Sequence, residues 1–236
     1  MAWHGAAALT FDVYGTLIDW RTGVAGVLVP WAAENGVGAG REDLLNGFLE
    51  CEGARQRAEP ELRYPQILEL AFADLAARFG VRPDPDTAES FGESVDTWPA
   101  FADAPGALAS LAQHCRLAAI ANVDRASLNA SARRLGAAFD VAVTAEDAGA
   151  YKPDPAPFRQ ALTELSEIGV GFDRIIHVAH SGDRDLEPAR ALGLATWHVA
   201  ASGGAGDART PEPRAERCFA AMADLAAAVA RAGNGG

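Results

Sequence analysis

The stretch AAALTFDVYGT, residues 6–16, decides the fold predicted for this chain. Its first six residues are almost all apolar and predict a short buried strand. Asp12 follows at the end of that strand, and Gly15 and Thr16 add a turn and a hydroxyl close to its carboxylate. An aspartate nucleophile can be displayed in this way at the carboxyl edge of a parallel sheet. The segment therefore predicts an α/β protein whose chemistry depends on Asp12.

Composition places the chain among ordinary globular proteins. Of its 236 residues, 49% are hydrophobic and 22% are charged, and the formal net charge is −12. This acidic balance disfavours binding to nucleic acid or to an anionic membrane. Apolar stretches are too short or too interrupted to span a bilayer, and residues 1–5 do not resemble a signal peptide. Cys51, Cys115 and Cys218 lack a metal-ligand spacing, so we expect reduced thiols and a cytoplasmic location.

The hydrophobic rhythm changes along the chain. Residues 18–100 repeat apolar positions at steps of three and four, which predicts helices. Later segments alternate strand-like and helical patterns, which indicates a parallel sheet; the strands are expected at 117–121, 139–143, 174–178 and 194–199. The sequence thus predicts an α/β fold, a doubly wound, Rossmann-like parallel-sheet core with an inserted helical cap. We expect residues 1–17 and 101–236 in the core domain and 18–100 in the cap domain.

Polar side chains follow the predicted strands and should meet at one edge of the sheet. Lys152 is expected to keep the Asp12 carboxylate ionised against neighbouring carboxylates. Asn122 and nearby backbone amides are suited to hold a substrate carboxylate, or Asn122 serves only as a turn former. Asp185 is placed to orient Lys152 or to polarise a hydrolytic water. The predicted catalytic residues are Asp12, Thr16, Asn122, Lys152 and Asp185.

Three segments in this order, residues 12–16, 144–155 and 177–193, resemble motifs of the haloacid dehalogenase (HAD) superfamily. Within it they are similar to the type II L-2-haloacid dehalogenase group. Phosphatase members carry a second Asp, as a general acid, where this chain has Tyr14. Because a halide leaves without needing a proton, Tyr14 favours the dehalogenase group over the phosphatases.

The resemblance implies a mechanism and roles for four residues. Asp12 would attack the α-carbon and expel halide with inversion, and water would then hydrolyse the aspartyl ester to a 2-hydroxy acid. Thr16 would support the nucleophile, Lys152 would balance its charge and Asp185 would assist hydrolysis. No metal or other cofactor is implied. Relatives are often dimers, so a homodimer is compatible with the resemblance, although no feature of this sequence fixes the oligomeric state.

The chain departs from the family pattern at several positions. Ala121 stands where a Ser or Thr would donate to the substrate carboxylate, Phe158 where the dehalogenases have Tyr, and Gly182 where they have Asn. The arginine that stabilises halide in the first long cap helix also lacks a clear counterpart, because Phe48 or Leu49 falls near its place. The candidates for that arginine are Arg41, Arg55 and Arg63.

Several side chains are predicted to line the substrate site. Trp20 follows the first motif, and Phe48 and Tyr64 lie in the cap, where each is as well suited to packing between helices. His180 is suited to a structural role or to the wall of the pocket. The predicted substrate-binding set is Tyr14, Trp20, Arg41, Phe48, Tyr64, Ala121, His180 and Ser181.

Four functions are compatible with these observations. The first is a hydrolase resembling L-2-haloacid dehalogenase, acting on a small 2-substituted carboxylate. The second keeps Asp12 but displaces another leaving group, as in a strained-ring imino acid such as azetidine-2-carboxylate. The third is a magnesium-dependent phosphatase using Asp12 and Asp185, which the missing second Asp disfavours. The fourth is a binding protein on a degenerate core, against which the joint presence of Asp12, Thr16, Lys152 and Asp185 argues.

Overall fold

Six parallel strands form one sheet in the computed structural model, which describes residues 6–82, 85–200 and 214–233. The strands are β1 (Ala8–Phe11), β2 (Arg116–Ala121), β3 (Val141–Thr144), β4 (Ile175–Ala179), β5 (Ala195–Val199) and β6 (Arg217–Phe219). Their order across the sheet is β3-β2-β1-β4-β5-β6. The predicted parallel α/β core is therefore confirmed. The short edge strand β6 was not predicted, because three partly exposed residues are too few to show a strand pattern.

Strand β1 lies in the middle of the sheet, and helices cover both of its faces. All four of its residues are buried, and it pairs with β2 on one side and β4 on the other. A strand buried on both faces needs a continuous apolar sequence, which the run ALTF nearly provides. The strand order reverses direction between β1 and β4, the kind of position where parallel sheets bind ligands.

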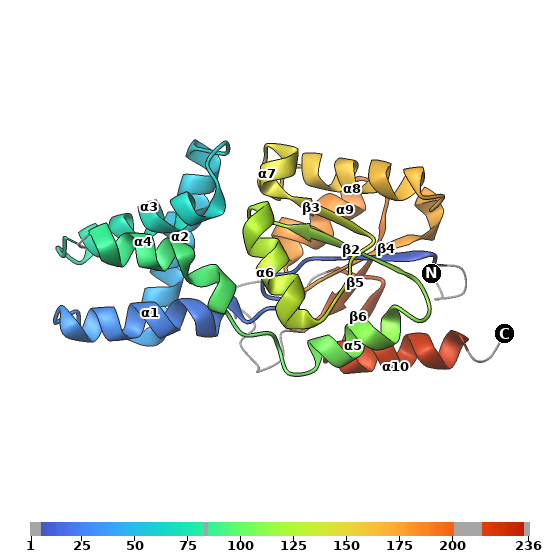
Figure 1. Cartoon of the computed structure of the whole chain (residues 1–236), viewed down its shortest axis with the longest axis horizontal. Coiled ribbons are helices and arrows are strands. Elements are labelled where there is room, and N and C mark those ends of the chain that lie inside the picture. Colours follow the sequence, from blue (N-terminus) through green and yellow to red (C-terminus); the bar gives the residue numbers. More distant parts are fainter. Residues whose placement is uncertain (1–5, 83–84, 201–213, 234–236) are drawn as a thin grey trace.

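The helices of the core lie in two layers, one on each face of the sheet (Figure 1). Leu9 and Phe11 of β1 belong to the same hydrophobic cluster as residues from α5 (Ala104–Leu111), α6 (Arg125–Leu135) and α10 (Met222–Gly233). Ala8 belongs to a second cluster with residues from α8 (Ala156–Glu167) and α9 (Glu187–Ala191). This alternation follows from the two-residue period of a strand. Shorter helical segments are α7 (Ala145–Ala148), η2 (Phe172–Arg174) and η3 (Gly182–Leu186).

The inserted helical cap stands to one side of the sheet (Figure 1). It comprises α1 (Trp20–Glu34), α2 (Arg41–Ala58), α3 (Tyr64–Arg78), α4 (Pro85–Glu93) and the short turn η1 (Ser94–Thr97). Aromatic rings pack between these helices. The ring centroid of Phe72 lies 5.1 Å from that of Trp31 and 5.3 Å from that of Phe91. The apolar periodicity of residues 18–100 thus builds an aromatic-rich interior of the cap, which is continuous with the hydrophobic cluster on one face of the sheet.

Two chain segments connect the cap to the core, and they hydrogen-bond to each other. The Asp19 N–H donates to the Pro99 carbonyl at 2.8 Å, and the Phe101 N–H donates to the Leu17 carbonyl at 2.9 Å. The predicted cap limits, residues 18 and 100, fall within this pair, where Ile18 forms a bridge with Ala100. The exact domain limits stay a prediction.

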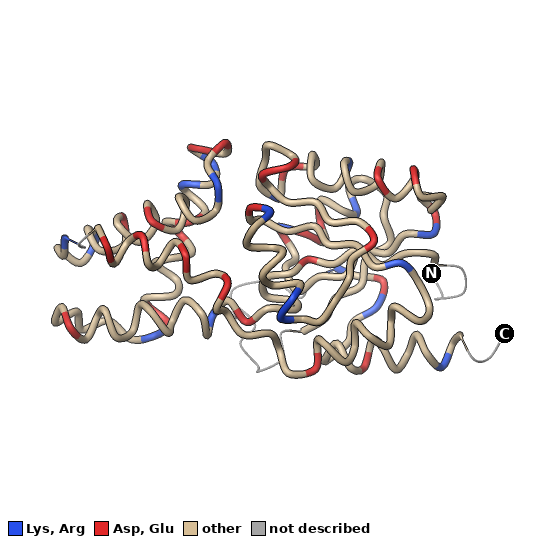
Figure 2. Tube along the Cα trace, in the orientation of Figure 1, with Lys and Arg blue, Asp and Glu red and all other residues tan. Residues whose placement is uncertain are grey.

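Charged residues are dispersed along the chain. Acidic and basic positions both occur in the cap and in the core (Figure 2). Within the described ranges, every helix is too short or too polar to cross a membrane.

Candidate active site

Side chains that follow four strands of the sheet gather around one residue, Lys152. Asp12 follows β1, Asn122 follows β2, Lys152 follows β3 and α7, and Asp185 lies in η3 after β4. Lys152 is the only lysine in the 236-residue sequence. Its Nζ donates to Asp12 Oδ1 at 2.8 Å, to Asp185 Oδ1 at 2.5 Å and to the Ile120 carbonyl at 2.9 Å. All three of its N–H groups are therefore engaged, in a position where the side chain is 2% exposed.

The carboxylate of Asp12 is held on both oxygens. Oδ1 accepts from Lys152, and Oδ2 accepts from the Thr16 hydroxyl at 2.7 Å. The same hydroxyl oxygen accepts from the His180 backbone N–H at 3.0 Å, which fixes its orientation. Gly15 makes this turn at φ +105°, a backbone conformation that residues with a side chain rarely adopt. The carboxylate that sequence analysis predicts as the nucleophile is thus buried and fixed in orientation.

Burial and the shared ammonium act on the two carboxylates differently. Burial raises the pKa of Asp12, opposed by Lys152, and the negative charge of Asp185 raises it further. Burial would also raise the pKa of Asp185, but Lys152 and His177 outweigh it, and the net shift is downward. Burial would lower the pKa of Lys152, but the two carboxylates raise it above its usual value. Asp185 and Lys152 are therefore charged at neutral pH, and Asp12 is the easier carboxylate to protonate.

His177 completes the group, and sequence analysis assigned it only to a strand. Its imidazole is fully buried, with Nδ1 2.9 Å from the Thr10 hydroxyl and Nε2 3.4 Å from Asp185 Oδ1. Phe158 packs edge-to-face on this ring at 5.2 Å. A polar residue within the apolar strand IIHVA was the available signal, because a buried imidazole needs partners.

Asn122 contacts the backbone of Lys152. Its Nδ2 donates to the Lys152 carbonyl at 3.0 Å, and its Oδ1 accepts from the Lys152 N–H at 2.7 Å. The amide thus anchors the loop that carries the lysine, which leaves it less able to bind a substrate carboxylate than the sequence suggested. A long-range contact of this kind carries no signal in the sequence.

Tyr14 packs among aromatic residues between the core and the cap. Its hydroxyl lies 2.8 Å from Ser131 Oγ on α6, and its ring centroid lies 5.8 Å from Trp98 and 6.5 Å from Tyr64. Burial raises the pKa of the Tyr14 hydroxyl, so the group is neutral at ordinary pH. A neutral phenol bound to Ser131 is not placed as the general acid that phosphatases have at this position.

Two predicted substrate-binding residues lie in other environments. Phe48 is buried inside the cap, 5.5 Å from Phe91 in an edge-to-face contact, because helix periodicity turns it toward the cap core. Arg41 is about half exposed and pairs with Glu42 at 2.9 Å. Packing within the cap explains the position of Phe48, and a surface ion pair explains that of Arg41. The structure gives neither side chain a contact with Asp12.

The other predicted residues lie near the cluster or beside it. Trp20 approaches the turn that follows Asp12, since a Cβ on Gly15 would lie 3.3 Å from the indole Nε1. Ala121 is buried at the end of β2. The ring of His180 lies 5.7 Å from that of His198. The hydroxyl of Ser181 accepts from the Arg184 N–H at 3.3 Å and so caps η3.

A polar group between the cap and the core was missed in the sequence. Glu52 of α2 is 4% exposed, and its Oε1 accepts from the Tyr64 hydroxyl at 2.8 Å. Its Oε2 lies 3.4 Å from the guanidinium of Arg184, a residue of η3. The negative charge of Glu52 raises the pKa of Arg184, which is therefore charged. Nothing local in the sequence indicates that residues 132 positions apart would pair.

The donor set around Asp12 does not suit a divalent cation. Such ions favour several oxygen ligands, usually with more than one carboxylate. Here the ammonium of Lys152 already lies between Asp12 and Asp185, and Tyr14 stands in place of a further carboxylate. Among the residues with described positions, no group of three or more His, Cys, Asp or Glu side chains could hold a metal ion.

Comparisons with known proteins concern the family and the fold of the chain. A family model described as haloacid dehalogenase-like hydrolase matches residues 6–193. No curated protein matches the sequence. A solved defluorinating L-2-haloacid dehalogenase is 20% identical with a TM-score of 0.80, covering 95% of each chain.

Two further solved structures are similar. The L-2-haloacid dehalogenase from Xanthobacter autotrophicus is 20% identical with a TM-score of 0.77, covering 95% of this chain and 98% of that one. The HAD-hydrolase YfnB from Bacillus subtilis, bound to magnesium, is 16% identical with a TM-score of 0.76, covering 95% and 99%. At these identities the likeness concerns the fold.

Proposed function

The chain belongs to the haloacid dehalogenase-like hydrolase family, and we propose that it hydrolyses a small 2-substituted carboxylic acid through an aspartyl ester on Asp12. The leaving group is a halide, and the product is a 2-hydroxy acid. The observation that carries this proposal is the single lysine, which holds the carboxylates of Asp12 and Asp185 at 2.8 Å and 2.5 Å.

In the first step, an oxygen of Asp12 forms a bond to C2 of the substrate. The bond between C2 and the leaving group breaks, and the halide departs with its electron pair. No proton is needed for this departure, which is consistent with a neutral Tyr14 held by Ser131. Lys152 and Thr16 keep the nucleophile ionised, because both lower the pKa that burial raises.

In the second step, water attacks Cγ of the Asp12 ester. Asp185 accepts a proton from that water, and its ionised state follows from its contact with Lys152. The ammonium lies beside Asp12 Oδ1 and stabilises the charge that develops on the tetrahedral intermediate. The bond between Cγ and the ester oxygen then breaks, and the 2-hydroxy acid leaves with a proton from Asp185. Asp12 is left as a carboxylic acid and releases the remaining proton of the water to solvent, which restores its carboxylate.

Halide release from each enantiomer of 2-chloropropionate tests this proposal, with and without a chelator. We expect release from the L enantiomer alone, unaffected by the chelator and abolished in Asp12→Asn. Asp173→Asn is a matched control, because Asp173 is exposed in η2 at the opposite end of β4. Turnover that survives in Asp12→Asn would contradict the proposal.

A second candidate keeps the same nucleophile with another leaving group, such as the ring nitrogen of a strained imino acid. Two observations favour it: Phe48 packs inside the cap, and Arg41 pairs with Glu42 on the surface. The cap helix therefore offers no evident cation for a halide at those positions. Ring opening of azetidine-2-carboxylate without halide release from any chlorinated acid would favour this candidate.

A further inference from the structure

The guanidinium of Arg184 has hydrogen-bonding capacity that its partner does not use. It carries five N–H donors, and its contacts with Glu52 run from Nη1 at 3.5 Å and Nη2 at 3.4 Å to one oxygen, Oε2. Charge-assisted hydrogen bonds of good geometry are shorter, about 2.7–2.9 Å. Arg184 is thus held loosely on one side.

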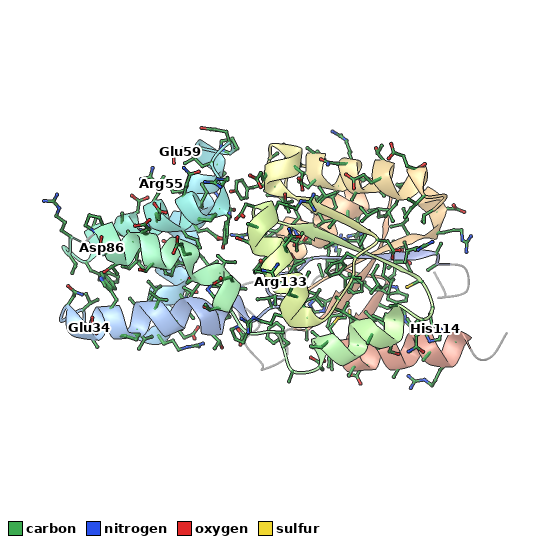
Figure 3. The ribbon with its side chains drawn as sticks, in the orientation of Figure 1. Glu34, Arg55, Glu59, Asp86, His114 and Arg133 are labelled. Carbon is green, nitrogen blue, oxygen red and sulfur yellow. The ribbon has the colours of Figure 1, made fainter. Side chains whose placement is uncertain are left out.

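Arg55 in the same cap provides a contrast. Its Nε and Nη2 donate to the two oxygens of Asp74 at 2.7 Å and 2.8 Å, a closed fork of two parallel hydrogen bonds. Arg55 and Glu59 lie together at the C-terminal end of α2 (Figure 3). Asp74 thus accepts from Arg55 with both of its oxygens at short distances. Glu52 accepts from Arg184 with a single oxygen at longer distances.

The location of Arg184 connects it to the catalytic cluster. Its neighbour in sequence, Asp185, pairs with the ammonium that also binds Asp12. On the cap side, Glu52 accepts from Tyr64, whose ring lies 6.5 Å from the ring of Tyr14. The Arg184 side chain is 35% exposed, whereas that of Glu52 is 6% exposed, so part of the Arg184 side chain faces solvent beside a buried carboxylate.

The side chains of Lys152 and Asn122, the two predicted for this region, already have partners. The three N–H groups of Lys152 go to Asp12, Asp185 and the Ile120 carbonyl. The amide of Asn122 spans the backbone of Lys152, and position 121 is an alanine without a hydroxyl. A small carboxylate held for attack by Asp12 needs a cation or several donors to offset the repulsion between the two anions.

We propose that Arg184 binds the carboxylate of the substrate through two parallel N–H···O hydrogen bonds, while Glu52 and Tyr64 hold the guanidinium in position. This assignment deepens the proposed function and rests on it for the class of substrate. A planar guanidinium matches a carboxylate better than it matches a spherical halide. The site then receives its anion specificity from η3 of the core.

Binding of propionate, an unreactive carboxylate without a leaving group, tests the proposal in the intact protein. Isothermal titration calorimetry should show that Arg184→Gln weakens propionate binding by about 10- to 100-fold. Arg184→Lys keeps the positive charge but loses the two parallel N–H donors. Its affinity for propionate should therefore lie between those of the wild type and of Arg184→Gln. Glu52→Gln removes the competing anion but preserves a hydrogen-bond acceptor, so it should bind propionate more tightly than the wild type.

Three controls separate anion binding from a structural role. Arg78→Gln, which breaks an exposed ion pair between Arg78 and Glu50, should leave propionate binding unchanged, and circular dichroism should show that each variant is folded. Propionamide, the neutral analogue, should bind more weakly than propionate. Chloride, as a probe of a leaving-group site, should bind the wild type and Arg184→Gln equally.

The proposal is overturned if wild-type protein fails to bind propionate or if Arg184→Gln binds it within twofold of wild type. It is also overturned if Glu52→Gln weakens binding as much as Arg184→Gln, because the pair would then serve only to join cap and core. Loss of chloride binding alone would assign Arg184 to the leaving group instead. An absence of halide release with propionate binding intact would contradict the leaving group proposed above, but not the role of Arg184.

Discussion

Replacing Lys152 by Met removes the charge that two buried carboxylates share. Met has a similar length and no hydrogen-bond donor, so Asp12 and Asp185 lose contacts of 2.8 Å and 2.5 Å and face each other without a cation. Breaking a buried ion pair by removing one partner costs about 3–5 kcal/mol. We therefore expect the free energy of unfolding at pH 7 to fall by about that amount, a large part of the ~5–15 kcal/mol of a typical domain.

The loss should depend on pH with a definite sign. In the wild type, the raised pKa of Lys152 stabilises the fold below about pH 10, and the lowered pKa of Asp185 stabilises it above about pH 4, so both contribute at pH 7. In Lys152→Met, mutual repulsion and burial raise the folded-state pKa of one carboxylate above its unfolded value. Proton uptake then favours the folded variant as the pH falls, and the difference from wild type should shrink between pH 7.5 and pH 5.

Urea denaturation followed by circular dichroism at both pH values measures this difference. The double variant Lys152→Met with Asp185→Asn removes one of the two repelling charges and should recover part of the lost stability. A difference below about 1 kcal/mol at pH 7, or one that stays constant with pH, would refute the reasoning. Because the chain has one lysine, NMR of lysine labelled with ¹³C at Cε should give a single side-chain signal that titrates above the usual lysine range.

Three further outcomes are expected. The kcat/KM of the hydrolase should fall on the acid side with a pKa above the usual aspartate value, because burial raises the pKa of Asp12 and the nucleophile must be ionised; a pH–rate profile checks this. Thr16→Val should lower kcat/KM at pH 7 by about tenfold or more and move that acid limb to higher pH, since the lost hydrogen bond favoured the carboxylate; an unmoved limb would contradict it. Gly23→Ala should lower the melting temperature, because its Cβ would lie 2.2 Å from Cδ1 of the buried Trp98, and overpacking costs about 1–3 kcal/mol; calorimetry checks this.

Local patterns in the sequence determined the fold class and the position of the chemistry. Apolar runs ending in polar residues predict strands with functional groups at their carboxyl ends, because burial on both faces and the two-residue period are properties of short segments. Asp12 and Thr16 were predicted together because they lie four positions apart in one turn. Lys152 and Asp185 were expected nearby because parallel strands all end at one edge of the sheet.

Tertiary structure alone decided which side chains meet across that edge. The strand order, the short edge strand β6 and the anchoring of the Lys152 backbone by Asn122 depend on pairings between distant segments. Phe48 shows the same limit in the cap, since a helical period indicates a buried face without saying whether other helices or a substrate cover it. Glu52 of α2 and Arg184 of η3 meet only in the folded chain, because they lie 132 positions apart in the sequence. Local periodicity specifies the elements of this chain, but the contacts that position its charges arise only when those elements pack together.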